Sequence, residues 1–182
     1  MSSLVCLSVE DRILRSSKTK NVTGAMTIGK PGVEQTRTHT PEDAIAILDI
    51  FQKYGHNEID TSRFYGEGSS EEYLAKIKWQ ERGLVMDTKY YPTAGKPLVA
   101  PDQPEGGWRH TPEHLRENLM KSLKALNAQS VDMWYLHGPD RTTPYETTLR
   151  AVNDLYKEGL FKRFAISNYM AWVSREFGDQ ML

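Results

Sequence analysis

Apolar and polar positions follow two different patterns along the chain, and segments with the two patterns alternate. Stretches with apolar residues three and four positions apart predict helices, and short continuous apolar runs between them predict strands. We expect helices to begin at Thr40, Ser69, Thr111 and Thr143, and strands to lie within 21–29, 57–60, 84–89, 131–137 and 160–166. Strands that alternate with helices in this way predict a parallel sheet.

Local signals mark the predicted helix ends. Thr40, Thr111 and Thr143 each precede a proline, which is the pattern of a capping residue followed by the first helical position. The run Ser69-Ser70-Glu71-Glu72 has the form of a capping box, in which a glutamate returns the hydrogen bond of the capping serine. The segment 90–110 is rich in proline and glycine, and a loop of this length inside a domain is often a functional one.

The predicted elements amount to about five strand–helix units, the last of them unfinished. A closed (β/α)8 barrel needs eight units and typically about 250 residues. We therefore expect an α/β fold in which residues 21–182 form an incomplete barrel that stops in mid-architecture, preceded by an N-terminal arm or hairpin over 1–20. A half-barrel would leave two sheet edges unpaired, so we also expect possible self-association through those edges.

Composition narrows the functional classes. The chain has 182 residues, a formal net charge of −1, 38% hydrophobic and 26% charged residues, which is the balance of a globular domain. A charge near zero gives no general attraction to nucleic acid or anionic membranes, and no apolar run approaches membrane-spanning length. The sole cysteine, Cys6, excludes an internal disulfide, and residues 1–15 lack the form of a signal peptide. We expect a cytoplasmic protein that binds neither nucleic acid nor membrane.

Three predicted strands end in residues that carry chemistry. Asp60, Lys89 and His137 stand at the carboxyl ends of three strands, and Tyr65 lies on the loop after the first of them. In an α/β barrel all parallel strands point their carboxyl ends at one face, so these four side chains should share a site. Each of them alone also has an ordinary structural explanation, such as a turn or cap. The combination at three strand ends favours a functional one.

These four residues suit the protonation of a carbonyl oxygen. A free phenol has a pKa of about 10, and the ammonium of Lys89 would lower the pKa of Tyr65, with Asp60 holding Lys89 as its ion-pair partner. Neutral His137 could donate a hydrogen bond to a substrate oxygen or help to pass the proton. Because no side chain donates a hydride, a nicotinamide cofactor is implied.

Other kinds of site find less support. The run Gly66-Glu67-Gly68 lacks the third glycine of a dinucleotide fingerprint. The remaining histidines do not cluster with carboxylates at metal-ligand spacing, and surface polarity explains His110 and His114, so we expect no metal. A barrel lyase or isomerase with a lysine–tyrosine pair is the second enzyme class, and an activity that needs no nicotinamide would indicate it.

The chain resembles the aldo-keto reductases, most closely the branch of the aflatoxin aldehyde reductases. The resemblance runs from about Gly24 to Asn168. It is carried by the segments 24–32, 57–61, 65–72, 79–83, 87–89 and 136–140 in that order. The family is a (β/α)8 barrel that reduces aldehydes and ketones to alcohols with NADPH.

The resemblance implies a role for each matching residue. Tyr65 corresponds to the general acid, Lys89 and Asp60 to the residues that tune it, and His137 to the group that orients the small carbonyl substrate. Ser167 and Asn168 correspond to the pair that binds the nicotinamide carboxamide, with Asp60 also near the cofactor.

The resemblance and the loops also suggest where substrate would lie. Met26 resembles a residue of the pocket floor, and Tyr91 and Trp108 are candidates for a pocket wall. The later loops of the family, which grip the pyrophosphate and the 2′-phosphate, have no counterpart here, and the tail 172–182 lacks the apolar stripe of a barrel helix. The alternative hypothesis is therefore a non-catalytic fragment or interaction module derived from an aldo-keto reductase.

Overall fold

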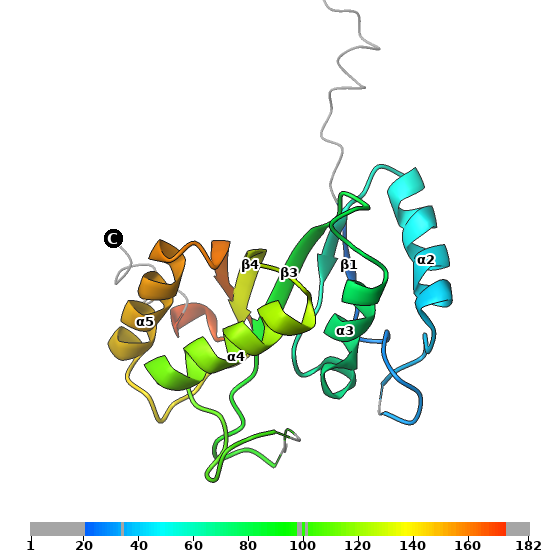
Figure 1. Ribbon diagram of the computed structural model, residues 1–182. Helices are drawn as coiled ribbons and strands as arrows, with labels where there is room; N and C mark the ends of the chain where they lie inside the picture. Colours follow the sequence, from blue (N-terminus) through cyan, green and yellow to red (C-terminus); the bar gives the residue numbers. More distant parts are fainter. Residues whose placement is uncertain (1–20, 34, 98–99, 101, 174–182) are drawn as a thin grey trace, which may run out of the picture.

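The computed structural model describes residues 21–33, 35–97, 100 and 102–173 (Figure 1). Its elements, in chain order, are β1 (Val22–Gly24), α2 (Pro41–Lys53), β2 (Glu58–Asp60), the 3-10 helix η1 (Tyr65–Gly68), α3 (Ser69–Lys76), β3 (Val85–Tyr90), α4 (Pro112–Ala125), β4 (Val131–Leu136), α5 (Tyr145–Lys157) and β5 (Phe161–Ile166). The expectations for residues 1–20 and for the tail after Val173 lie outside the described residues.

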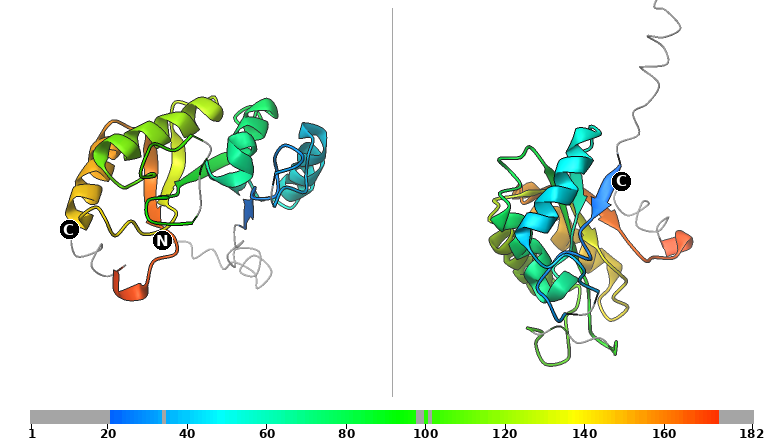
Figure 2. Two further views of the ribbon diagram at one scale, coloured as in Figure 1. Left: turned by 90° about the horizontal axis from the view of Figure 1, so that it is seen from below. Right: turned by 90° about the vertical axis from the view of Figure 1, so that its right-hand side faces the viewer.

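The five strands form one parallel sheet in the order β1-β2-β3-β4-β5. Helices α2 to α5 lie on one side of this sheet (Figure 2). The arrangement confirms the predicted alternation and is that of part of a (β/α)8 barrel. Within the described residues, β1 pairs with β2 alone and β5 pairs with β4 alone, so the sheet has two open edges.

Two of the four predicted helix caps form as expected. Thr40 and Thr111 accept hydrogen bonds from the backbone N–H groups of Asp43 and His114, three residues further on. The third threonine cap is wrong, because α5 has no side-chain cap and Thr143 donates its hydroxyl hydrogen to Asp140 Oδ2 at 2.7 Å.

The predicted capping box is also wrong. Gly68, in a left-handed conformation with φ of 89°, stands at the cap position of α3, and it makes no side-chain hydrogen bond. The hydroxyl of Ser69 instead donates to the Gly66 carbonyl and accepts from the backbone N–H of Lys30. In the same turn Glu71 is fully buried, pairs with Arg63 at 3.1 Å and accepts a hydrogen bond from Thr88 Oγ1 at 2.7 Å. Burial raises the pKa of Glu71, an effect that these hydrogen bonds and the charge of Arg63 oppose.

The core fixes which face of each strand meets the helices. Ile59 of β2, Met86 of β3 and Trp134 of β4 are at most 1% exposed and belong to the same buried cluster as the apolar residues of the helices. Since successive side chains of a strand point to opposite faces, Asp60 and Lys89 project from the other face. The hydrophobic pattern thereby places the polar residues at the strand ends on the side without helices.

Candidate functional site

The chain leaving β2 continues beside β3 and delivers Tyr65 just beyond the strand end. The backbone N–H of Thr61 donates to the carbonyl of Asp87 at 3.0 Å, and that of Arg63 donates to the carbonyl of Lys89 at 3.4 Å. The turn that follows requires glycine at position 66, where φ is 57° and an added Cβ would lie 2.7 Å from Ser69 Oγ. The extended segment and the tight turn together aim Tyr65 back at the end of β3.

Asp60 and Lys89 form a mostly buried ion pair at the carboxyl ends of β2 and β3. Lys89 Nζ lies 2.6 Å from Asp60 Oδ2 and also donates a hydrogen bond to the Thr61 carbonyl at 2.9 Å. Lys89 is 6% exposed. Burial lowers the pKa of Lys89 and raises that of Asp60, and in each case the charge of the partner opposes the effect of burial.

Tyr65 joins this pair to His137. The hydroxyl oxygen of Tyr65 accepts a hydrogen bond from Lys89 Nζ at 3.3 Å and lies 3.4 Å from Nε2 of His137. The Tyr65 and His137 rings meet edge to face with their centroids 5.5 Å apart. The structure therefore brings all four predicted catalytic residues into one chain of contacts.

The pKa of Tyr65 does not move in the expected direction. Burial, together with the negative charge of Asp60, raises the pKa of Tyr65 to about 12. The expectation that the ammonium of Lys89 lowers this pKa is wrong for this arrangement, because burial of the phenol raises the pKa and the carboxylate of Asp60, 2.6 Å from Lys89 Nζ, raises it further. Tyr65 is consequently protonated at neutral pH, which is the form that a general acid needs.

His137 is neutral at the same pH. It follows the end of β4, and its backbone N–H donates to the carbonyl of Tyr90 at 2.8 Å. Burial and the positive charges of Lys89 and Lys96 lower its pKa to about 4. Its ring also meets the ring of Tyr91 edge to face at 5.5 Å.

Among the described residues predicted to bind cofactor or substrate, some lie beside His137 and others do not contact the four-residue site. Asn168 follows β5 with φ of 62°, and its Nδ2 donates to the carbonyl of His137 at 2.8 Å and to Ser167 Oγ at 3.1 Å. Ser167, Asn168 and Tyr91 thus lie beside His137.

Met26 and Trp108 are not joined to the four residues by any contact found among the described residues. Met26 is 42% exposed, just after Ala25, whose backbone N–H donates to the Asp60 carbonyl. Trp108 is 2% exposed and packs on His114 and under the ammonium of Lys121 of α4. The assignment of Trp108 to a substrate wall stays a prediction, and the burial of its side chain in the core does not favour it.

Sequence patterns did not predict the burial of two polar residues near the site. Ser62 is fully buried and lies 3.3 Å from Nδ1 of His137. His110, which surface polarity was expected to explain, is also fully buried against the Tyr90 ring. No local pattern distinguishes either residue, since both become buried only when segments distant in sequence pack on them.

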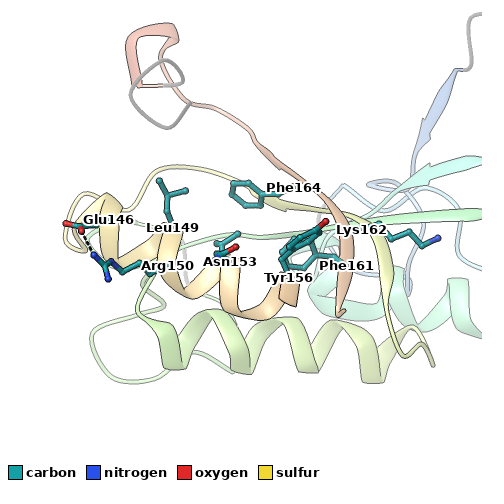
Figure 3. A pocket seen from close by; sticks show the side chains of 9 residues that line it. Glu146, Leu149, Arg150, Asn153, Tyr156, Phe161, Lys162 and Phe164 are labelled. Carbon is teal, nitrogen blue, oxygen red and sulfur yellow. Dashed lines mark hydrogen bonds and ion pairs between the residues drawn. The ribbon is translucent and has the colours of Figure 1, made fainter. Parts of the chain in front are cut away.

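A cleft of about 500 Å³ lies away from these residues, between α5 and β5 (Figure 3). One face of α5 lines it with Leu149, Asn153 and Tyr156, and β5 contributes Phe161 and Phe164. Glu146 and Arg150 form an ion pair at its rim, at 2.7 Å. This cleft belongs to the open edge of the sheet, not to the four-residue site.

Neither a metal-binding cluster nor a membrane-spanning helix occurs among the described residues. No group of three or more histidine, cysteine or carboxylate side chains there could hold a metal ion. No helix there is long and apolar enough to cross a membrane.

Comparison with known protein families agrees with this geometry, in which a tyrosine, a lysine, an aspartate and a histidine meet at the strand ends of a parallel α/β sheet. A family model described as the aldo/keto reductase family matches residues 22–180. The chain therefore belongs to the aldo/keto reductase family.

Individual relatives agree with this result. Aldo-keto reductase pigE of Monascus ruber is 47% identical over 154 residues, which are 83% of this chain and 44% of that protein. Human aflatoxin B1 aldehyde reductase member 4 is 34% identical over 169 residues, covering 91% of this chain and 45% of that protein. Both spans are less than half the length of the relative. The expected likeness to the aflatoxin aldehyde reductases is confirmed.

A solved structure shows the same fold. Aldo-keto reductase AKR11C1 of Bacillus halodurans, in its holo form, superposes with a TM-score of 0.68 at 24% identity, and the match covers 87% of this chain and 49% of that one. The described sheet and helices therefore correspond to about half of a barrel of this family, as the sequence predicted.

Proposed function

We propose that this chain carries the carbonyl-protonating part of an NADPH-dependent aldo-keto reductase, which reduces aldehydes or ketones to alcohols. The observation that carries the proposal is the unbroken chain of contacts from Asp60 through Lys89 and Tyr65 to His137, with distances of 2.6, 3.3 and 3.4 Å. Three of these residues come from the ends of adjacent strands, so the sheet itself sets their spacing.

Each residue has a distinct task in this reaction. Tyr65 donates its hydroxyl proton to the carbonyl oxygen as that oxygen gains charge, and solvent later restores the proton. Lys89 stabilises the phenolate that remains, and Asp60 keeps Lys89 in place. The hydride that the carbonyl carbon accepts would come from a reduced nicotinamide, when one is bound. His137, neutral at pH 7, orients the carbonyl group that receives the proton from Tyr65.

The nicotinamide end of the cofactor has partners in this chain. Both hydrogens of Asn168 Nδ2 are engaged, by the His137 carbonyl and Ser167 Oγ. The Oδ1 of Asn168 and the hydroxyl of Ser167 would bind the carboxamide. Asp60 Oδ1 is buried without a hydrogen-bond partner among the described residues, so it is an acceptor that a bound group near the pair could use.

Binding of the cofactor is the first test. Purified chain is titrated with NADPH while the quenching of tryptophan fluorescence is followed, with Asn168→Ala as the variant and Asn153→Ala, on α5, as a matched control. Saturable binding that Asn168→Ala weakens and Asn153→Ala leaves intact supports the proposal. A folded chain that does not bind NADPH would contradict the cofactor part of the proposal.

The role of Tyr65 is the second test. Tyr65→Phe removes one oxygen and keeps the ring, so aldehyde reduction should fall by about 10² to 10⁴-fold while the fold is retained. Tyr73→Phe is the control, because Tyr73 hydroxyl donates to the His39 carbonyl, outside the site. Reduction that is unchanged in Tyr65→Phe would exclude the assigned role.

The alternative, an interaction module, has one observation in its favour, the apolar cleft at the open edge between α5 and β5. If that edge self-associates, light scattering after size exclusion should show an oligomer that Phe164→Glu dissociates. A monomer at all concentrations, combined with NADPH binding, would favour the enzyme. The cytoplasmic location stays a prediction that rests on the single cysteine.

A further inference from the structure

Ser62 lies between the end of β2 and Tyr65, and its side chain touches both Lys89 and His137. The hydroxyl donates to the backbone carbonyl of Lys89 at 3.2 Å, accepts from the backbone N–H of Phe64 at 3.2 Å, and lies 3.3 Å from Nδ1 of His137. Ser62 is fully buried. Its hydrogen must therefore go to one of these protein neighbours and not to water.

The three contacts can be satisfied together in one way. A serine hydroxyl has one hydrogen and two lone pairs. If the hydrogen points to the Lys89 carbonyl, the oxygen is left as an acceptor, and the contact with His137 requires a hydrogen on Nδ1. If the hydrogen points to Nδ1 instead, the oxygens of Ser62 and Lys89 face each other at 3.2 Å with no hydrogen between them.

The same assignment fits the other side of the imidazole. A neutral imidazole with its hydrogen on Nδ1 has a lone pair on Nε2. The hydroxyl of Tyr65 accepts from Lys89 Nζ at 3.3 Å and lies 3.4 Å from that lone pair, so it can donate its own hydrogen to Nε2. The hydrogen bonds then run in one direction from the Lys89 ammonium through Tyr65, His137 and Ser62 to the Lys89 carbonyl, and bonds arranged head to tail strengthen one another.

We propose that Ser62 is a positioning residue that holds His137 in the Nδ1–H tautomer in the ligand-free chain and so directs the Tyr65 hydroxyl hydrogen to Nε2. In this state His137 accepts a hydrogen bond from the general acid, and an entering carbonyl oxygen must draw that hydrogen away from Nε2. The inference deepens the proposed function, and its catalytic consequence rests on it. The tautomer can be measured without turnover.

The test is the ¹⁵N spectrum of the histidine rings at pH 7, with the His137 signals assigned from a His137→Gln variant. We expect a protonated, pyrrole-type Nδ1 and an unprotonated, pyridine-type Nε2 for His137. In Ser62→Ala the ratio of the Nδ1–H to the Nε2–H form should fall about fivefold, the equilibrium equivalent of one lost hydrogen bond. Ser62→Thr keeps the hydroxyl and should keep the wild-type tautomer.

Ser70→Ala is the matched control. Ser70 is also fully buried and bonds to the Thr61 hydroxyl and the Ala25 carbonyl, not to His137, so its loss should leave the His137 signals unchanged. An Nε2–H tautomer in the wild-type chain would overturn the proposal even if Ser62→Ala failed to fold. So would an unchanged tautomer in folded Ser62→Ala. An Nδ1–H tautomer in a chain that reduces no aldehyde would instead contradict the proposed function and leave the role of Ser62 in setting the tautomer intact.

Discussion

Two charged clusters share strands β2 and β3, where their residues stand two positions apart, and they are built differently. The tyrosine site contains Asp60, Tyr65, Lys89 and His137, where one ammonium contacts one carboxylate and a phenol, and the phenol contacts an imidazole. The arginine cluster contains Glu58, Asp87, Asp132 and Arg163, where one guanidinium serves three carboxylates. Arg163 lies 2.5 Å from Glu58, 2.6 Å from Asp132 and 3.7 Å from Asp87.

The difference lies in what each cluster can do with a proton. In the tyrosine site the proton-bearing phenol meets a neutral imidazole in one chain of hydrogen bonds, which suits proton transfer to a bound carbonyl. In the arginine cluster, burial and the nearby Glu58 raise the pKa of Asp87 to about 7, and Arg163 offsets this in part. That cluster ties β2, β3 and β4 to the edge strand β5. Similar charges thus surround a protonated phenol in one layer and join neighbouring strands in the other.

The largest effect is expected from Lys89→Met. The change leaves the Asp60 carboxylate without its partner and removes the cation beside Tyr65, so the chain should lose about 3 kcal/mol of stability and nearly all carbonyl reduction. Urea unfolding and an aldehyde-reduction assay measure the two effects. Lys121→Met is the control, since its partners Asp102 and Glu117 are half exposed and the loss should stay below about 1 kcal/mol. Equal losses of stability in both variants would show that the Asp60–Lys89 pair contributes no more to stability than a half-exposed ion pair.

Arg163→Met should have the next largest effect and should act on stability rather than on the tyrosine site. It leaves three carboxylates near one another, at a cost of roughly 2 kcal/mol at pH 8. The cost should be smaller at pH 5, where Asp87, with its raised pKa, is protonated. Arg150→Met, which removes an exposed ion pair with Glu146 on α5, serves as the comparison in urea unfolding at both pH values. A loss of stability in Arg163→Met that does not change with pH would show that repulsion among the three carboxylates does not cause it.

Asp87→Asn should have the smallest effect at pH 5, where Asp87 is already protonated, and its consequence should appear in the pH dependence of stability. Because the folded-state pKa of Asp87 is raised to about 7, the folded chain retains a proton that the unfolded chain releases near pH 4. This group therefore makes the wild type less stable as the pH rises from about 4 to 7. The variant should lack this decline, which a rise of about three pKa units limits to about 4 kcal/mol. Parallel unfolding curves for the two proteins across this range would show that Asp87 ionises normally in the fold.

The strand–helix alternation and the strand-end residues could be predicted because they depend on local order in the chain. Periodicity placed Asp60, Lys89 and His137 at strand ends, and parallel strands bring such ends together without further information. The capping box at Ser69 and the threonine cap at Thr143 were predicted by the same local rules and were wrong. Ser69 donates to the Gly66 carbonyl and accepts from the backbone N–H of Lys30, and Thr143 donates to Asp140, three residues before it, so other hydrogen bonds replaced the predicted caps.

The sequence by itself determined the α/β class, the order of the elements and the four residues of the tyrosine site, since hydrophobic periodicity and strand polarity are local properties. The tertiary structure decided the electrostatics. Whether Lys89 would lower the pKa of Tyr65 depended on the 2.6 Å contact with Asp60 and on burial. The positions of Ser62 and His110 depended on segments packed over them from far along the chain. Distances, desolvation and hydrogen-bond direction arise only when these segments meet, because the local sequence does not specify them.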